Sequence, residues 1–153
     1  MNIISLETAT GCAVLIFIVG GYERFYRIPK WFENPPQSFG LIATQTKKST
    51  VFWIPVQALF IAALIISIIT NWKYADVRIY LLLALGCFLA VAGLTGTYFV
   101  KEILTFSKMP ATTPLTSGLK KRAQTWLKWT TVRNVIQAVS LGLLVVALTK
   151  SKY

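Results

Sequence analysis

The sequence predicts an all-α integral membrane protein, a four-helix bundle with up-down topology in a single domain. Of its 153 residues, 55% are hydrophobic and only 14% are charged, and the mean hydropathy is +0.60. A water-soluble domain carries about a quarter charged residues, so a soluble enzyme is disfavoured. Four apolar segments are each long enough to cross a bilayer, because about 30 Å of hydrocarbon takes about 20 helical residues. The chain has no His and only two Cys, which excludes imidazole-based catalysis and a disulfide framework.

The four expected spans cover residues 3–22, 51–70, 77–99 and 131–149. Each is expected to be a helix, because a backbone in lipid has to satisfy its own hydrogen bonds and barrel strands would alternate in polarity. The first segment lacks both the basic start and the small-residue cleavage site of a signal peptide. We therefore expect it to be retained as a membrane span.

The second and third spans are expected to be antiparallel neighbours. Trp53 and Trp72 would lie about 28 Å apart along one helix, which matches the two headgroup levels of a bilayer. The connection that follows, residues 71–76, is tight and forces the next span to return beside the second. Pro55 falls in the first turn of the second span, where a missing N–H does little harm. Before the fourth span, the sequence becomes helical and amphipathic from Leu119 onward.

The net charge of +11 is unevenly distributed along the chain. Most of the 16 Lys and Arg residues fall in the two long connections, between the first and second spans and between the third and fourth. The positive-inside rule therefore predicts that both long loops are cytoplasmic and both termini outside, with the chain in the cell inner (plasma) membrane. A basic surface facing anionic lipid headgroups explains the charge. No RNA- or DNA-binding motif accompanies it, so the expected partner is the lipid bilayer and not a nucleic acid.

The fourth span carries a polar stripe, whose members recur every three or four residues and so share one helical face. An Arg or Gln side chain facing lipid would cost about 1–3 kcal/mol, so the stripe is expected to point into the bundle. Glu102, near the end of the third span, is the expected partner of Arg133, because a carboxylate and a guanidinium can pair through two hydrogen bonds. The stripe consists of Trp126, Thr130, Arg133, Gln137 and Ser140.

Together these faces predict a polar pocket near the cytoplasmic leaflet. An aromatic wall with a few polar groups suits a hydrophobic, aromatic or quinone-like small molecule. In the enzyme version of this hypothesis, a cofactor-free oxidation, Tyr98 and Glu102 handle protons and Arg133 stabilises an anion. No cofactor and no metal is expected. The open alternative is a structural clamp of Glu102 and Arg133 with interhelical hydrogen bonds around it. The expected ligand-binding residues are Trp53, Gln57, Trp126, Trp129 and Gln137.

A second function stays open, that of a non-catalytic membrane subunit or scaffold. Gly86, Ala90, Gly93 and Thr97 form a small-residue face on the third span, and small residues let helices approach closely. Such a face can pack against a neighbouring span or against a second copy in a homo-oligomer. Transport is a weaker alternative, because no span is broken at mid-membrane by Gly and Pro in the manner of carriers.

The start of the fourth span carries a resemblance to a known family. Trp126, Trp129 and Arg133, followed by a helix of Leu, Val and Ala, resemble the Trp-x-x-Trp…Arg pattern that closes the anthrone-oxygenase-like family of small four-span membrane proteins. Thr130 stands where that family usually has Asn. The long loop before the last helix is also similar, so the resemblance implies the same four-span fold.

Overall fold

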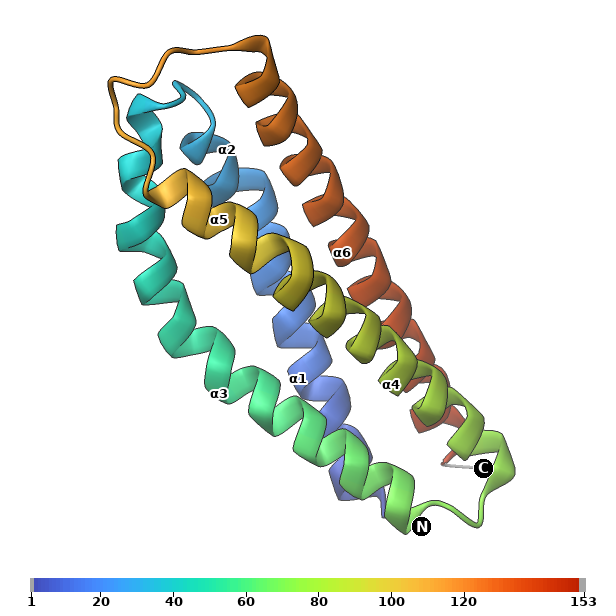
Figure 1. Ribbon diagram of the computed structural model, residues 1–153. Coiled ribbons are helices and arrows are strands. Elements are labelled where there is room, and N and C mark those ends of the chain that lie inside the picture. Colours follow the sequence, from blue (N-terminus) through green and yellow to red (C-terminus); the bar gives the residue numbers. More distant parts are fainter. Residues whose placement is uncertain (1, 152–153) are drawn as a thin grey trace.

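The computed structural model, which describes residues 2–151, confirms the all-α class. Long apolar helices pack antiparallel as in a four-span membrane bundle (Figure 1). Two short π-helices, η1 and η3, interrupt the first and third rods of this bundle. In chain order the elements are α1 (Ile3–Tyr22), η1 (Glu23–Arg27), α2 (Ile28–Trp31), the 3₁₀-helix η2 (Gln37–Phe39), α3 (Gly40–Thr70), α4 (Ala75–Leu94), η3 (Thr95–Phe99), α5 (Val100–Ser107) and α6 (Ser117–Lys150).

Four helical rods are long and apolar enough to cross a membrane, and each expected span falls inside one of them. The rods are longer than the apolar stretches because a helix keeps its backbone hydrogen bonds satisfied through the headgroup region. Long basic side chains at the rod ends can reach water while their stems cover apolar surface. The rods run Ile3–Trp31, Gln37–Thr70, Ala75–Ser107 and Ser117–Lys150.

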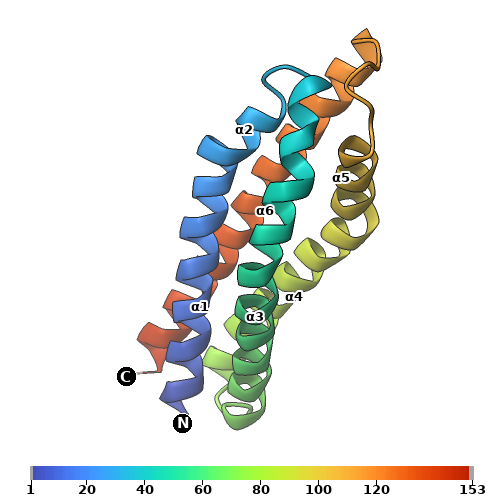
Figure 2. The same cartoon turned by 90° about the vertical axis from the view of Figure 1, so that its left-hand side faces the viewer.

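The rods form a ring in which α1 packs against both α3 and α6, and α4 packs against α6. Helices α3 and α4 are joined by a short connection, yet they touch each other much less than the other neighbouring pairs do. The second rod contacts the third rod at two places, near the connection that joins α3 to α4 and where α3 meets α5. Between these two places the second and third rods lie apart (Figures 1 and 2). The chain begins and ends at the same end of the bundle (Figure 1), as up-down topology requires.

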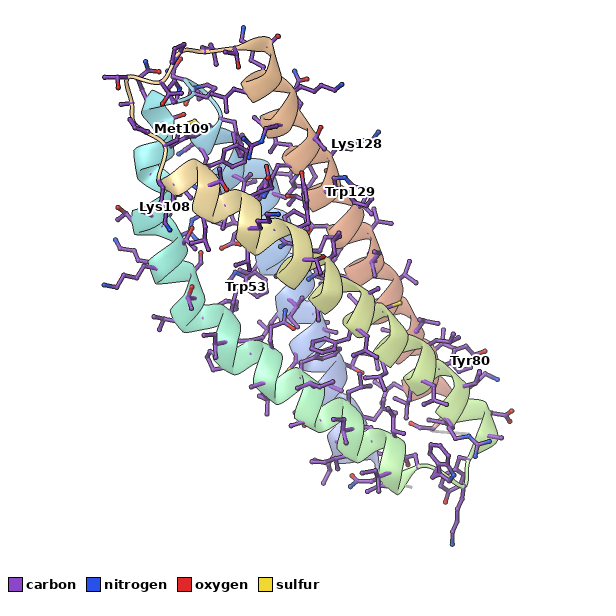
Figure 3. The ribbon with its side chains drawn as sticks, viewed as in Figure 1. Trp53, Tyr80, Lys108, Met109, Lys128 and Trp129 are labelled. Atoms are coloured by element: carbon purple, nitrogen blue, oxygen red, sulfur yellow. The ribbon has the colours of Figure 1, made fainter. Side chains whose placement is uncertain are left out.

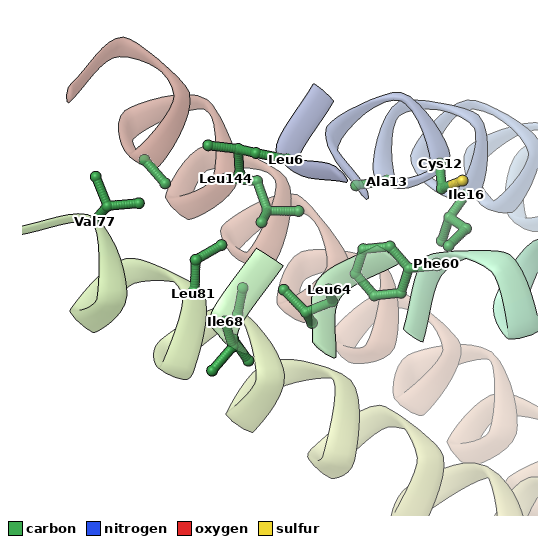
Figure 4. Close-up of a cluster of buried hydrophobic side chains, with 12 residues drawn as sticks. Leu6, Cys12, Ala13, Ile16, Phe60, Leu64, Ile68, Val77, Leu81 and Leu144 are labelled. Atoms are coloured by element: carbon green, nitrogen blue, oxygen red, sulfur yellow. The ribbon is translucent and has the colours of Figure 1, made fainter. Parts of the chain in front are cut away.

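The half of the bundle that contains the chain ends, here called the terminal half, has a close-packed aliphatic core (Figure 4). Leu6, Leu64, Leu81 and Leu144, one from each rod, are all fully buried. Without a hydrophobic driving force between helices in lipid, such packing is a main source of helix association. The whole cluster comprises Leu6, Cys12, Ala13, Ile16, Phe60, Leu64, Ile68, Val77, Leu81, Ala84, Leu144 and Ala147.

A buried side chain, Asn71, ties the two helix ends of the terminal half together. Its Oδ1 accepts a hydrogen bond of 2.9 Å from the backbone N–H of Asn2, and its Nδ2 donates to the carbonyl oxygen of Ser67 at 3.0 Å. Asn2 in turn caps α1, because its Oδ1 accepts from the backbone N–H of Ser5. The residue after α3 thus fixes where α1 begins.

The opposite half, here called the loop half, has an aromatic core. Phe99 packs edge-on against Trp126 with ring centroids 5.3 Å apart, and Phe39 lies 5.1 Å from Phe106. The cluster comprises Ile28, Trp31, Phe39, Ile42, Phe99, Phe106, Leu119 and Trp126.

Candidate functional site

A cavity of about 590 Å³ lies in the loop half, where the second and third rods separate. Its mouth is marked by lining residues that are also exposed: Thr50 and Ile54 on α3, and Ala92, Gly96 and Val100 on the rod that faces it. The mouth therefore opens sideways between two membrane helices. The lining comprises Glu23, Ile28, Trp31, Thr46, Ser49, Thr50, Trp53, Ile54, Gln57, Phe88, Val91, Ala92, Thr95, Gly96, Phe99, Val100, Ile103, Trp126, Arg133 and Gln137.

Arg133 of α6 is the cation of this cavity. Its Cζ lies 4.7 Å from the centroid of the Phe99 ring, a favourable cation–π contact. Its Nε is buried and has no hydrogen-bond partner, and Arg133 forms neither a hydrogen bond nor an ion pair with any residue of the described chain. A guanidinium presents five N–H donors, so most of the donor capacity of Arg133 is unused.

Glu23, which is only 9% exposed, is the carboxylate of the cavity, and both of its oxygens accept hydrogen bonds. Its Oε1 accepts hydrogen bonds from Arg27 Nη1 at 2.9 Å and from the Ser49 hydroxyl at 2.8 Å. Its Oε2 accepts from Trp53 Nε1 at 3.1 Å. Arg27 thereby neutralises Glu23, and these bonds join the end of α1 to α3.

The two π-helices position the groups that face the cavity. A π-helix contains an extra residue per turn, which rotates everything after it by about 100° relative to an unbroken α-helix. The first residue of η1 is Glu23, which is buried, and the last residue of η3 is Phe99, which is 3% exposed. Both interruptions thus lie at the level of the cavity, where each places a buried side chain on its wall.

The cavity brings together five of the eight residues that the sequence predicts for the site. Gln57, Trp53 and Trp126 line it with Arg133 and Gln137. Figure 3 shows Trp53 projecting from α3 toward the interior of the bundle. The predicted inward orientation of the polar stripe on α6 is also supported, because Thr130 is fully buried and Ser140 is 6% exposed.

The other three predicted residues lie outside the lining of the cavity. Tyr98 packs against Trp129 with ring centroids 6.4 Å apart. Trp129 is 42% exposed and lies on the outer side of α6 (Figure 3). The third predicted residue outside the lining is Glu102. A role of these three residues in chemistry stays a prediction.

The expected pairing of Glu102 with Arg133 is wrong. Glu102 pairs instead with Arg122, whose Nη2 lies 3.0 Å from Oε1 and whose Nε lies 3.2 Å from Oε2. The physical reason is η3, which precedes Glu102 and turns its face of the helix away from Arg133. Phe99 takes the position beside Arg133 in its place.

A close approach of α1 and α6 fixes the lower edge of the site. The Asn134 Nδ2 donates to the carbonyl oxygen of Gly20 at 3.2 Å. A Cβ atom at Gly20 would lie only 3.3 Å from Gln137 Oε1, so a larger residue here would require the Gln137 side chain to shift. Gln57 and Gln137 form no hydrogen bond with the described residues, so both amides remain free toward the cavity.

Sequence reasoning did not assign Glu23, Ser49, Trp31 or Phe99 to the site, although all four line the cavity. A signal for Glu23 was present, because an acidic residue directly after an apolar span needs a partner or water. Nothing in the sequence marks a π-helix, so the inward orientation of Phe99 could not be anticipated.

The free groups of the cavity can bind a hydrogen-bond acceptor on a hydrophobic body. No group of three or more His, Cys, Asp or Glu side chains that could hold a metal ion occurs between residues 2 and 151. Comparisons of this chain with protein-family models, with curated protein sequences and with solved structures find no match.

Proposed function

We propose that this protein binds a hydrophobic, aromatic or quinone-like small molecule in the cavity of the loop half. The observation that carries the proposal is Arg133, a cation without a hydrogen-bonding partner on the wall of an aromatic-lined space. The volume of about 590 Å³ falls within the range of about 300–1,000 Å³ that small-molecule sites occupy. A buried, unpaired charge in a membrane helix is costly, and a ligand with an acceptor group would offset that cost.

Access from the bilayer supports a lipid-soluble ligand. The mouth lies between helices long and apolar enough to span the membrane, and it is flanked by Ile54, which is 65% exposed, and Val100, which is 45% exposed. On the third rod, the mouth is also bordered by two small residues, Ala92 and Gly96. A molecule dissolved in the acyl chains would therefore reach Arg133 without crossing water.

We place the loop half, and with it the cavity, on the cytoplasmic side of the cell inner membrane, with both termini outside. The argument is the positive-inside rule, since basic residues concentrate at this end of the chain's rods. They are Arg24, Arg27, Lys30, Lys47, Lys48, Lys101, Lys108, Lys120, Lys121, Arg122 and Lys128.

Binding has more support than oxidation. The proton-handling residues of the oxidation hypothesis, Tyr98 and Glu102, lie outside the lining, and the carboxylate inside it, Glu23, already accepts three hydrogen bonds. Oxidation by Tyr98, Glu102 and Arg133, and likeness to the anthrone-oxygenase-like family, remain predictions from the sequence.

The experiment is binding of menadione, a compact quinone, to the purified protein in mild detergent, read from quenching of tryptophan fluorescence. Three tryptophans, Trp31, Trp53 and Trp126, line the cavity and would report the ligand. Replacing Arg133→Leu should weaken binding by about tenfold or more, equivalent to about 1.4 kcal/mol.

The matched control is Arg78→Leu. Arg78 also makes a cation–π contact, 4.9 Å above the Trp72 ring, but it lies at the other end of the bundle. This variant should bind menadione like the wild type. Equal binding by wild type and Arg133→Leu, with both folded by circular dichroism, would contradict the proposed site.

The alternative role, a membrane subunit or scaffold, has one observation in its favour. All four members of the small-residue face, Gly86, Ala90, Gly93 and Thr97, are exposed on the third rod. A second helix could approach closely there. Native mass spectrometry in mild detergent tests this role: a dimer that Gly93→Leu dissociates would support it, and a monomeric wild type would count against it.

A further inference from the structure

The cavity has a surplus of hydrogen-bond donors. Arg133 and Trp126 can only donate, and both carry a buried nitrogen, Nε and Nε1 respectively, with no partner among the described residues. The Thr46 hydroxyl, on the same lining, is likewise buried without a partner. A molecule that matches this wall has to present acceptor atoms.

The one carboxylate among the described residues that line the cavity, Glu23, is already engaged by groups of the protein. Glu23 receives hydrogen bonds from Arg27, Ser49 and Trp53, and no other Asp or Glu lines the cavity. Glu23 forms no ion pair with Arg133. Its ion pair is with Arg27.

Arg27 pairs with Glu23 from outside the lining, and when it is counted with Glu23 and Arg133 the three charges sum to one positive charge. Glu23 and Arg27 cancel, and Arg133 remains. Within a membrane such a charge is stabilised most by an opposite charge at close range, since screening by water is weak there. A neutral carbonyl would satisfy some donors of Arg133 but would leave its charge uncompensated.

We infer that the ligand of this cavity is an amphipathic monoanion, an oxyanion head that pairs with Arg133 on an apolar body that lies between the aromatic walls and the mouth. This inference rests on the proposed binding function and specifies the chemistry of the ligand. The head is of carboxylate type, because a guanidinium and a carboxylate match through two parallel hydrogen bonds. The apolar body is either an acyl chain from the bilayer or an aromatic ring system.

The test compares each carboxylate with its uncharged amide. A brominated palmitate and the corresponding amide are titrated into the purified full chain, with quenching of tryptophan fluorescence as the readout. Naphthoate and naphthamide are then measured by displacement of menadione, so that this comparison does not depend on binding of the palmitate. At least one carboxylate should bind about tenfold or more tightly than its amide, and the one that does identifies an acyl or an aromatic ligand.

Three variants, two expected to reduce the preference for carboxylates and one expected to raise carboxylate affinity, keep the test independent of folding losses. Arg133→Leu should abolish the preference for carboxylate over amide, whereas Arg133→Lys should keep part of it. Glu23→Gln removes the only carboxylate in the lining and leaves Arg27 without its counter-charge, so carboxylates should bind several-fold more tightly than to the wild type. A gain of affinity cannot arise from partial unfolding.

The outcomes separate this inference from the proposed function. Equal affinities for acid and amide, with menadione still bound, would overturn the monoanion and leave the binding function standing. Weaker carboxylate binding in Glu23→Gln would also overturn it. Failure of all the compounds, menadione included, would remove the binding function and the inference together.

Discussion

The terminal half and the loop half of the bundle contain the same four rods but differ in what lies between them. In the terminal half, aliphatic side chains from all four rods meet at fully buried positions such as Leu64 and Leu81. In the loop half, the core is aromatic, and it borders a cavity of about 590 Å³. The rods are thus closely packed at one end, whereas at the other end they pack through aromatic side chains beside a cavity.

The difference shows how a small membrane bundle can accommodate a site without a separate domain. Close packing and the Asn71 hydrogen bonds hold the rods at the terminal half. The loop half is then free to carry features that are poor for stability, namely a buried unpaired Arg133 and two π-helices. We expect stability to depend on the first half and ligand binding on the second.

The largest effect is expected for Leu81→Ala in the terminal half. Leu81 is fully buried, so its truncation leaves a void that the packed neighbours cannot fill, and the free energy of unfolding should fall by about 2–5 kcal/mol. Unfolding in mild detergent by heat or by added dodecyl sulfate measures this change. Affinity for menadione in the folded fraction should stay within about twofold of the wild type.

The paired variant in the loop half is Ile103→Ala. Ile103 is partly buried and already borders the cavity, so its truncation enlarges a space instead of creating one. The loss of unfolding free energy should be below about 1 kcal/mol, with a clear change in ligand affinity. A loss as large as that of Leu81→Ala would contradict the division between the two halves.

An effect smaller than that of Leu81→Ala is expected at the boundary of the two halves, where α1 meets α6. Gly20→Leu would force a side chain against Gln137, since even a Cβ would lie 3.3 Å from its Oε1. Overpacking of this kind should destabilise by about 1–3 kcal/mol and weaken menadione binding through displacement of Gln137. The control is Gly11→Leu on the same helix, where a Cβ meets no atom within 4 Å. Equal effects of the two substitutions would show that the contact at Gly20 is unimportant.

The fold was predictable because hydropathy alone decides which segments lie in lipid. All four expected spans lie inside observed rods. The rods are longer, since polar residues such as Lys47 and Arg122 continue a helix that hydropathy does not detect. The inward-facing side of α6 was also predictable. Because α6 is an uninterrupted helix of 34 residues, the sequence spacing of two residues determines whether their side chains lie on the same face.

The face of the third rod was not predictable, because η3 breaks the periodicity on which the prediction depended. Spacing placed Tyr98 and Glu102 with Arg133, whereas the structure turns Phe99 toward it. The same holds for Glu23, whose burial follows from η1 and from the partners that α3 supplies. A sequence pattern shows which residues of one helix share a face, whereas the contacts of Phe99 and Glu23 also depend on how a second helix packs against the first.

The smallest effect is expected for Glu102→Gln, which distinguishes the observed pairing from the one that the sequence predicted. The ion pair of Glu102 with Arg122 is partly exposed, with 43% of the Arg122 side chain accessible, so its loss should change the free energy of unfolding by less than about 1 kcal/mol. Menadione affinity should be unchanged, because Glu102 does not line the cavity.

Arg122→Leu is the control. The Arg122 guanidinium also lies 5.3 Å from the centroid of the Phe106 ring, so this variant should cost slightly more than Glu102→Gln, and the double variant should cost no more than Arg122→Leu alone. Loss of menadione binding in Glu102→Gln but not in Arg122→Leu would mean that Glu102 reaches the site in a conformation other than this one. In that case the predicted pairing with Arg133 would have to form when the ligand binds, and the unpaired state of Arg133 would belong to the empty protein alone.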